Sequence, residues 1–329
     1  MREHRFNIDN VFLRGIKDMA KAEHGKNKIK KDTSAIKLFF MSLPAVILII
    51  VFNYIPAGEY IIAFKDYKIG RGIIGSDWAG LENFRLLFEN IHFNKILLNT
   101  VLYNSAFFVV VNVAGLGAAT LLFRLKNLHI KGFFRAVLVL PYVISWVFAG
   151  EIVYALFSND SGIINQVIGF FGGEKVLWYN TPAVWPVIIT LAFAWKNAGV
   201  CSVVYYAALQ GIDHGMTEAA ELDGAGEFRI FSDIILPQIL PAVFLIALIN
   251  ISGIFKSDYE MFTQLTRESG GIFGTTDVLD TYFRRGMQTT DLSFSAAAGL
   301  LQSAAGCLAA FFVLCLARRE NNRFRRDIF

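Results

Sequence analysis

Long stretches without a charged residue dominate this sequence and restrict what it can fold into. Charged residues make up 18% of the chain, and they gather in the first 37 residues, in a few short loops and in the last dozen positions. Soluble proteins carry roughly 25% charged residues. A helix of about 20 mostly apolar residues crosses the hydrocarbon layer of a bilayer. We therefore predict one integral membrane domain rather than several soluble domains.

Six segments are apolar and long enough to cross a membrane. They are residues 36–55, 97–123, 136–157, 184–208, 240–262 and 292–317. Because a segment in lipid must satisfy its own backbone hydrogen bonds, these runs are expected to be helices. Pro44, Pro141 and Pro241 fall within or at the start of spans, where neighbouring helices tolerate a kink. The predicted fold class is an all-α membrane protein with six transmembrane helices.

Lys and Arg residues are divided unequally between the two sides of this arrangement. Twenty lie in the two terminal segments and in the loops at 124–135 and 209–236, which are on the same side of the membrane. Eight lie in the loops on the opposite side. Cytoplasmic loops carry the excess of Lys and Arg, which predicts that both termini are cytoplasmic. The predicted regions are a basic N-terminal segment (1–35), a transmembrane domain (36–317) with a cytoplasmic loop (209–240), and a basic tail (318–329). The N-terminal cations are expected to attract anionic membrane lipid.

The start of the loop at residues 210–240 has the features of a helix N-terminus. Asp213 or Thr217 is a candidate cap for a helix that begins near Glu218, since a side-chain oxygen there satisfies a free N–H group. Glu218 in the first turn would suit the positive end of the helix dipole. Ala219 and Ala220 would leave one face nearly flat and open to close approach.

The second half of this loop predicts a turn and another helix. Gly224 can take the left-handed conformation that ends a helix. A second short helix through Phe228 and Phe231 would then lead to Pro237. The residues alone leave two interpretations open: a docking surface for another protein, or an interfacial amphipathic helix without a partner.

The spacing of residues in this loop resembles the EAA loop of ABC importer permeases. The matching positions are Glu218, Ala219, Ala220, Asp223, Gly224, Ala225, Ile234, Leu236 and Pro237. The stretches 52–84, 140–146 and 207–213 and the closing RRENNRFRRDIF resemble the polysaccharide and oligosaccharide branch of that family. The resemblance implies the type I importer permease fold. It also implies that these nine residues form a coupling helix seated in a cleft of an ATP-hydrolysing subunit.

The same resemblance implies the other components of the assembly. They are a second homologous permease, two ATP-binding cassette subunits and an extracellular or periplasmic solute-binding protein, at a bacterial cell membrane. The sequence has no G-x-x-x-x-G-K-[ST] phosphate-binding loop, so ATP and Mg²⁺ are expected on the partner subunits and no cofactor on this chain. CxxC pairs and His-rich tracts are absent, so neither a metal site nor a disulfide framework is indicated. No nucleic-acid partner is expected.

Ionisable residues inside spans are costly and by default mark a transport pathway. Lys196 lies near the middle of the fourth predicted span and is expected to face the protein interior. Lys256 and Glu260 flank Asp258 near the outer end of the fifth span, where contact with the membrane interface is the alternative. Glu151 fits either interpretation.

The chain is also similar to the maltose-transporter permeases, and that similarity implies a set of sugar-facing positions. The positions are Trp195, Lys196, Asn197, Asn250, Ile254 and Ser257. An aromatic face can stack on a sugar ring, while amides and hydroxyls bind sugar hydroxyl groups. Lys196 and Ile254 depart from the residues expected at their positions, so maltose is not the expected ligand. Lys196 indicates either an acidic sugar, such as a uronic-acid oligomer, or a pair with an interior carboxylate.

Two other classes of protein compete with the importer interpretation. A secondary sugar transporter or channel that is not driven by ATP would explain six spans but not the EAA-type loop. A membrane enzyme is disfavoured because the sequence has no Ser/His/Asp set, no paired catalytic carboxylates and only five scattered histidines. The predicted function is therefore a non-enzymatic permease subunit of a binding-protein-dependent ABC importer for an oligosaccharide.

Overall fold

The computed structural model describes residues 31–212, 214–288 and 292–328, in two compact units divided after Tyr60. The first unit is one helical run made of α2 (Lys31–Ile49), the π-turn η1 (Ile50–Tyr54) and α3 (Ile55–Ala57). Its large apolar side chains, such as Leu38 and Ile49, are exposed, as expected of a helix that faces lipid. Most of the basic N-terminal segment, residues 1–30, lies outside the described residues.

The described residues contain helices that match the predicted spans in number. The four unbroken ones are Lys37–Phe64, Phe93–Arg124, Pro182–Leu209 and Leu292–Cys315. Two further pairs are bent: Leu128–Val143 with Trp146–Phe157 at 94°, and Glu227–Leu240 with Ala242–Ile251 at 53°. Counting each bent pair as one span gives the six that the hydropathy pattern predicts.

Helix α10 (Trp185–Leu209) is central to the second unit. It packs against α6 (Phe93–Arg124), α7 (Leu128–Val143) and α13 (Leu236–Ser252), and α13 in turn packs against α17 (Leu292–Ile328). The helices approach closely because small residues lie between them. A Cβ atom added at Gly199 of α10 would lie 1.7 Å from the carbonyl oxygen of Leu138 in α7.

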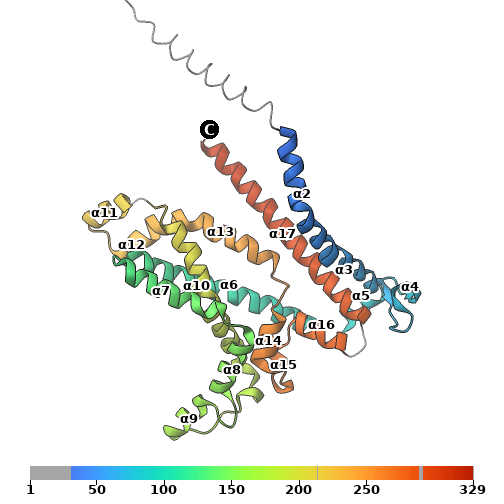
Figure 1. Cartoon of the computed structure of the whole chain (residues 1–329). Helices are drawn as coiled ribbons and strands as arrows, with labels where there is room; N and C mark the ends of the chain where they lie inside the picture. Colours follow the sequence, from blue (N-terminus) through green and yellow to red (C-terminus); the bar gives the residue numbers. More distant parts are fainter. Residues whose placement is uncertain (1–30, 213, 289–291, 329) are drawn as a thin grey trace, which may run out of the picture. The chain divides into compact units, whose positions relative to one another are not determined.

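Shorter elements surround the ends of this bundle. Helix α8 (Trp146–Phe157) packs on α14 (Tyr259–Thr266) near the N-terminal end of α10, and α11 (His214–Leu222) and α12 (Glu227–Ile230) lie at the other end (Figure 1). Strands β1 (Lys65–Asp66) and β2 (Asp77–Trp78) form an antiparallel pair with Lys65 opposite Trp78. The remaining elements are η2 (Gly58–Phe64), α4 (Gly72–Gly75), α5 (Glu82–Glu89), α9 (Ile163–Phe170), η3 (Trp178–Asn180), η4 (Pro182–Val184), η5 (Phe231–Ile235), η6 (Gly270–Ile272), α15 (Phe273–Thr276) and α16 (Leu279–Gln288).

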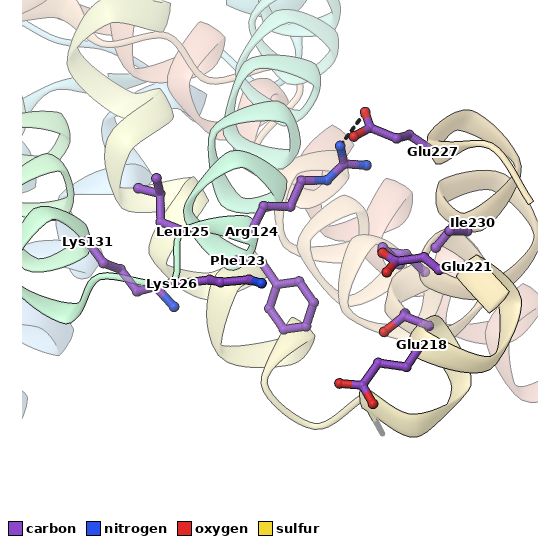
Figure 2. Close-up of a pocket in the computed structure, with 11 residues that line it drawn as sticks. Phe123, Arg124, Leu125, Lys126, Lys131, Glu218, Glu221, Glu227 and Ile230 are labelled. Carbon is purple, nitrogen blue, oxygen red and sulfur yellow. Dashed lines mark ion pairs between the residues drawn. The ribbon is translucent and has the colours of Figure 1, made fainter.

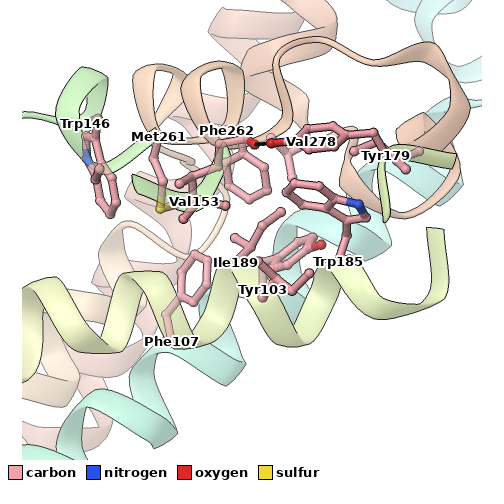
Figure 3. Packing of buried hydrophobic residues seen from close by; sticks show 14 residues of the cluster. Tyr103, Phe107, Trp146, Val153, Tyr179, Trp185, Ile189, Met261, Phe262 and Val278 are labelled. Carbon is pink, nitrogen blue, oxygen red and sulfur yellow. Dashed lines mark hydrogen bonds between the residues drawn. The ribbon is translucent and has the colours of Figure 1, made fainter. Parts of the chain in front are cut away.

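Buried side chains gather at both ends of α10. At its N-terminal end, aromatic residues of α6, such as Tyr103 and Phe107, meet Ile189 of α10 and Phe262 of α14 (Figure 3). At its C-terminal end, a second cluster joins the ends of α6 and α10 to α12, η5 and α13. The EAA loop is therefore attached to the bundle by a hydrophobic core of its own.

The third predicted span, 136–157, is two helices rather than one kinked helix. Helix α7 ends at Val143, and α8 begins at Trp146 with Ser145 as its N-cap, the Ser145 hydroxyl accepting from Phe148 N–H at 3.4 Å. A capping serine starts a new helix by satisfying one of its free N–H groups. Because the sequence prediction took the apolar run as continuous, it missed this start.

The fifth predicted span, 240–262, has the wrong boundaries. Its helical segment begins earlier, because α12, η5 and α13 follow one another from Glu227 to Ser252, with the 53° bend between Leu240 and Ala242. It also ends earlier, at the C-cap Gly253. Asp258 then caps α14, its Oδ1 accepting from Met261 N–H at 3.0 Å. Residues 253–258 are therefore a non-helical linker, and 259–262 belong to a different helix.

Candidate functional site

The corner of the EAA loop is a Schellman motif built around Gly224. The Gly224 N–H donates to the Glu221 carbonyl at 3.1 Å, and the Ala225 N–H donates to the Ala220 carbonyl at 2.9 Å. Gly224 has a φ of +81°, which costs a glycine almost nothing. Ala220 and Ala225 both pack against the adjoining hydrophobic cluster, as is usual for this motif. The predicted left-handed turn at Gly224 is confirmed.

The start of α11 differs from the prediction. The helix begins at His214, so Glu218 lies in its second turn and Thr217 is within the helix rather than at its N-cap. The additional turn is supported by a tertiary contact, since the Gln238 side-chain amide reaches Met216 Sδ at 3.9 Å. The other predicted cap, Asp213, lies outside the described residues.

The second helix of the loop is longer than predicted. It starts at Glu227 but does not stop before Pro237, because the π-turn η5 joins it to α13. Leu236 N–H donates to the Phe231 carbonyl, one residue further back than in an α-helix. Pro237, which has no N–H, lies at the start of the next helical segment, where none is needed.

The nine EAA-loop residues divide into an exposed and a buried group. The partly buried residues, which pack against the cluster at the ends of α6 and α10, are Ala220, Ala225, Ile234 and Leu236. The exposed residues are Glu218, Ala219, Asp223, Gly224 and Pro237. Two large apolar side chains beside the corner are also exposed, Leu222 at 90% and Phe228 at 82%. An exposed apolar pair next to a rigid corner is a surface suited to another protein.

A cleft of about 610 Å³ separates this loop from the turn between α6 and α7. Figure 2 shows basic residues along one wall and carboxylates along the other. The basic wall consists of Arg124, Lys126 and Lys131, and the acidic wall consists of Glu218, Glu221 and Glu227. Arg124 and Glu227 form an ion pair of 2.5 Å across the cleft.

Lys196 is buried, with 8% of its surface exposed, as the sequence predicted. Its partners are the last carbonyls of α7. The ammonium donates to the Tyr142 carbonyl at 2.8 Å, to the Pro141 carbonyl at 3.5 Å and to the Ile144 carbonyl. Among the described residues, no carboxylate forms an ion pair with Lys196, so the predicted alternative of an interior carboxylate partner is wrong. Lysine instead binds the Tyr142 and Ile144 carbonyls and shares the Pro141 carbonyl, which also accepts from the Ile144 N–H at 3.2 Å.

The bend between α7 and α8 is held by two further contacts that sequence reasoning missed. Trp146 Nε1 donates to Asp258 Oδ2 at 2.6 Å, while its ring lies 5.1 Å from the Lys196 ammonium. A Cβ atom added at Gly150 of α8 would lie 2.8 Å from the Gln264 carbonyl oxygen, so α8 and α14 meet backbone to backbone. These residues are far apart in the sequence, and no local pattern links them.

The other predicted pathway residues on helices bind within their own helix or face outward. Trp195 is 45% exposed. The Asn197 amide donates to the Phe193 carbonyl at 2.9 Å, and the exposed Asn250 amide donates to the Ile246 carbonyl at 2.8 Å. Among the described residues, these bonds use only the amide N–H groups, so the two amide oxygens can accept from another group.

The predicted residues after α13 lie in the linker and in α14. Lys256 and Glu260 are exposed, and the partly buried Ile254 accepts a 3.0 Å bond at its carbonyl from the Asn104 amide of α6. Ser257 is 7% exposed, and its hydroxyl has no hydrogen-bond partner among the described residues. Its N–H donates to Asp280 Oδ2 at 2.6 Å.

The linker is bound by three polar side chains that the sequence prediction did not include: Asn104, Asp280 and Gln302. The Gln302 amide donates both to Asp280 Oδ2 at 2.9 Å and to the Phe255 carbonyl at 2.7 Å. Burial raises the pKa of Asp280, although the Ser257 N–H and the Gln302 amide act in the opposite direction. The linker is therefore fixed from three sides, by α6, α16 and α17.

Comparisons with known proteins agree with this geometry. The family model described as "Binding-protein-dependent transport system inner membrane component" matches residues 111–319. The polygalacturonan/rhamnogalacturonan transport system permease protein YteP of Bacillus subtilis (strain 168) is 31% identical, over 91% of this chain and 93% of its own length. Protein LplB of the same strain is 28% identical, over 86% and 88%.

A solved structure has the same fold. It is the crystal structure of a bacterial ABC transporter involved in the import of the acidic polysaccharide alginate. One of its chains has 25% sequence identity and a TM-score of 0.78, with 88% of this chain and 98% of that chain covered. The chain thus has the importer permease fold, and it belongs to the family of binding-protein-dependent transport system inner membrane components, as a permease subunit of an ABC importer.

Proposed function

We propose that this chain and a second permease form the membrane pathway for an acidic oligosaccharide. Its EAA loop would dock on one of two ATPase subunits, which bind ATP and Mg²⁺, and a solute-binding protein would deliver the sugar on the opposite side. Two similar proteins support an acidic substrate. The permease YteP is named for polygalacturonan/rhamnogalacturonan transport, and polygalacturonan is a polymer of a uronic acid. The solved transporter imports the acidic polysaccharide alginate. One alginate transporter structure includes a periplasmic protein bound to an alginate pentasaccharide, which supports the binding-protein partner.

The coupling role is supported mainly by the exposed Schellman corner. Its backbone is fixed by two hydrogen bonds, and the exposed side chains at the corner include Glu218, Asp223 and the apolar Leu222. A corner that is already ordered loses little conformational entropy on docking. A rigid corner also moves as one body with the subunit that it contacts. The Lys and Arg distribution supports a cytoplasmic location for this loop and for both termini.

The acidic substrate is supported by the environment of Lys196. Its three carbonyl partners are neutral, so they solvate the ammonium without cancelling its charge. In a medium less polar than water, an uncancelled charge acts over several ångströms. An anionic sugar passing along α10 would therefore be favoured over a neutral one. Trp195, Asn197, Asn250 and Ser257 would supply the ring-stacking and hydroxyl contacts.

The mechanism we assign is alternating access. ATP binding draws the ATPase subunits together, the EAA loop moves with them, and the spans rotate so that the sugar site opens toward the binding protein. Hydrolysis returns the site to the cytoplasmic side. In this cycle the chain contributes the pathway and the mechanical link, and it carries out no chemical step.

The coupling role is tested with Gly224→Asp in the complete importer reconstituted in liposomes. We expect normal insertion but loss of ATP-driven uptake, because the side chain strains the left-handed turn and obstructs docking. Uptake equal to that of the wild type at matched expression would contradict the role. Uptake without ATP by the chain alone would instead support a secondary transporter.

The substrate class is tested with Lys196→Met and Lys196→Arg. Uptake of labelled oligogalacturonate is measured in competition with a neutral maltooligosaccharide, with the solute-binding protein held constant. We expect Lys196→Met to reduce the preference for the acidic sugar about tenfold, equivalent to about 1.4 kcal/mol. Lys196→Arg, which keeps the charge, should retain the preference. An unchanged preference in Lys196→Met would contradict a charge-based selection at this residue.

A further inference from the structure

The cleft beside the EAA loop has walls of opposite charge. The turn after α6 supplies Lys126, α7 supplies Lys131, and α11 supplies Glu218 and Glu221 (Figure 2). Lys126, Glu218 and Glu221 form no ion pair with any residue that the structure describes, while the Lys131 ammonium lies 5.5 Å from the Tyr206 ring centroid. The two walls therefore attract each other across open space.

One ion pair already crosses this cleft, and it joins two helix ends. Arg124 is the last residue of α6, and Glu227 is the first residue of α12. A cation at a C-terminus and an anion at an N-terminus also complement the dipoles of their own helices. Because α12 continues through η5 into α13, the pair connects the end of span two to the start of span five.

The pair is exposed, which limits what it can do for stability. The side chain of Arg124 is 38% exposed and that of Glu227 is 81% exposed. Exposed pairs add little to the stability of a fold. Folding in this region is instead provided by the apolar residues beneath the pair, such as Leu122, Ile230 and Ile235. A role for the pair therefore has to concern the relative position of the two helices.

We propose that Arg124 and Glu227 are positioning residues that make α6 follow the EAA loop when the ATPase subunits move it. This inference rests on the proposed coupling role of that loop. Docking moves α11 and the start of α12, and the ion pair transmits that displacement to the end of α6. Because α6 packs along α10, the movement reaches the helix that carries Trp195 and Lys196.

The charged walls define the direction of the movement. Narrowing of the cleft would bring the Lys126 side of the turn toward Glu218 and Glu221, which the opposite charges favour. Widening would stretch the Arg124–Glu227 pair instead. The α6–α7 turn would thus be a second coupling element that contacts the first within the same chain.

The test is a charge swap in the complete reconstituted importer. The variants are Arg124→Glu, Glu227→Arg and the double variant, and the readout is the amount of sugar imported per ATP hydrolysed. Each single variant should lower this ratio about fivefold with ATP hydrolysis within twofold of the wild type. The double variant should restore at least half of the wild-type ratio, since a reversed pair still links the helices. Single variants with a wild-type ratio, or a loss that the double variant does not restore, would overturn the proposal.

Two controls separate this result from others. The exposed pair Arg85–Glu82 of α5, swapped in the same way, should leave the ratio unchanged. Arg124→Gln covers the case in which a reversed charge prevents assembly, and a wild-type ratio in this variant would also overturn the proposal. If Gly224→Asp retains uptake, the coupling role itself fails. If Gly224→Asp abolishes uptake and Arg124→Glu does not alter the ratio, only the link fails.

Discussion

The EAA loop and the bend between α7 and α8 each contain a helix C-terminus, and the two ends are satisfied in opposite ways. Helix α11 ends in solvent through a backbone motif at Gly224, with few contacts from distant residues. Helix α7 ends beside α10, where the buried ammonium of Lys196 binds its last carbonyls. A helix end in solvent can present a surface, whereas an end within a candidate membrane span needs a donor from the protein for its carbonyls.

This difference separates positions where a substitution should impair docking from positions where it should impair folding. Nothing covers the corner at Gly224 within the described chain, so a substitution there should affect docking more than folding. At the bend, Gly199, Lys196 and Trp146 are enclosed by α7, α8 and α14, so substitutions should affect folding first.

The largest effect is expected for Gly199→Ala. The added methyl group would overlap the Leu138 carbonyl oxygen, which is backbone and cannot turn away. Forced separation of α7 and α10 should cost about 3 kcal/mol and lower the unfolding temperature of the purified protein in detergent. Gly117→Ala in α6 is the control, since its Cβ would meet no atom within 4 Å. Equal unfolding temperatures for the two variants would contradict the close contact.

Lys196→Met should destabilise the bend by about 2 kcal/mol, because buried carbonyls lose their donor. Thermal unfolding in detergent measures this loss directly. Lys256→Met removes the same charge from an exposed position in the linker, and it should change stability by less than about 0.5 kcal/mol. If both variants unfold at the wild-type temperature, Lys196 does not hold the end of α7.

Gly224→Ala should cost about 1 kcal/mol, confined to the loop, since a side chain at a φ of +81° is strained. Uptake driven by ATP should fall several-fold while the unfolding temperature stays close to that of the wild type. Gly226→Ala is matched to it, because both glycines have open space around them and Gly226 has a negative φ. Equal uptake by the two variants would remove the need for a left-handed corner.

The smallest effect concerns Asp280, next to the linker. Burial raises its pKa above the unfolded value of about 3.9, so its contribution to stability is full below that pH. That contribution is lost as the pH rises through the folded pKa. Wild-type protein should therefore lose stability relative to Asp280→Asn as the pH increases above about 4. Parallel stability curves for the two proteins over this range would contradict the assignment.

The sequence allowed the exposed region to be predicted better than the buried one. The Gly224 corner depends on residues within one turn of it, so a local pattern was sufficient. The start of α11 was placed about one turn too late, and the contact of its first turn with Gln238, more than 20 residues away, is not visible in a local pattern. The bend at Ser145 and the linker at 253–258 were missed because hydropathy does not distinguish one apolar helix from two with a cap between them.

The role of Lys196 illustrates the remaining gap. Its position in a span indicated that it is buried, and that prediction is confirmed. Its partners are backbone carbonyls at the end of another helix. Every residue has a backbone carbonyl, so no residue type in the sequence identifies these partners. The sequence therefore predicted the location of the charge but could not identify the group that binds it.

We propose that this permease works through ATPase subunits that its EAA loop contacts. The most direct measurement is affinity purification of the tagged chain from its native membrane, followed by mass spectrometry of the proteins that co-purify. We expect a second permease and an ATPase subunit, with the ATPase lost when Glu218 or Gly224 is substituted. Recovery of the chain alone, still able to transport sugar in liposomes without ATP, would contradict the account.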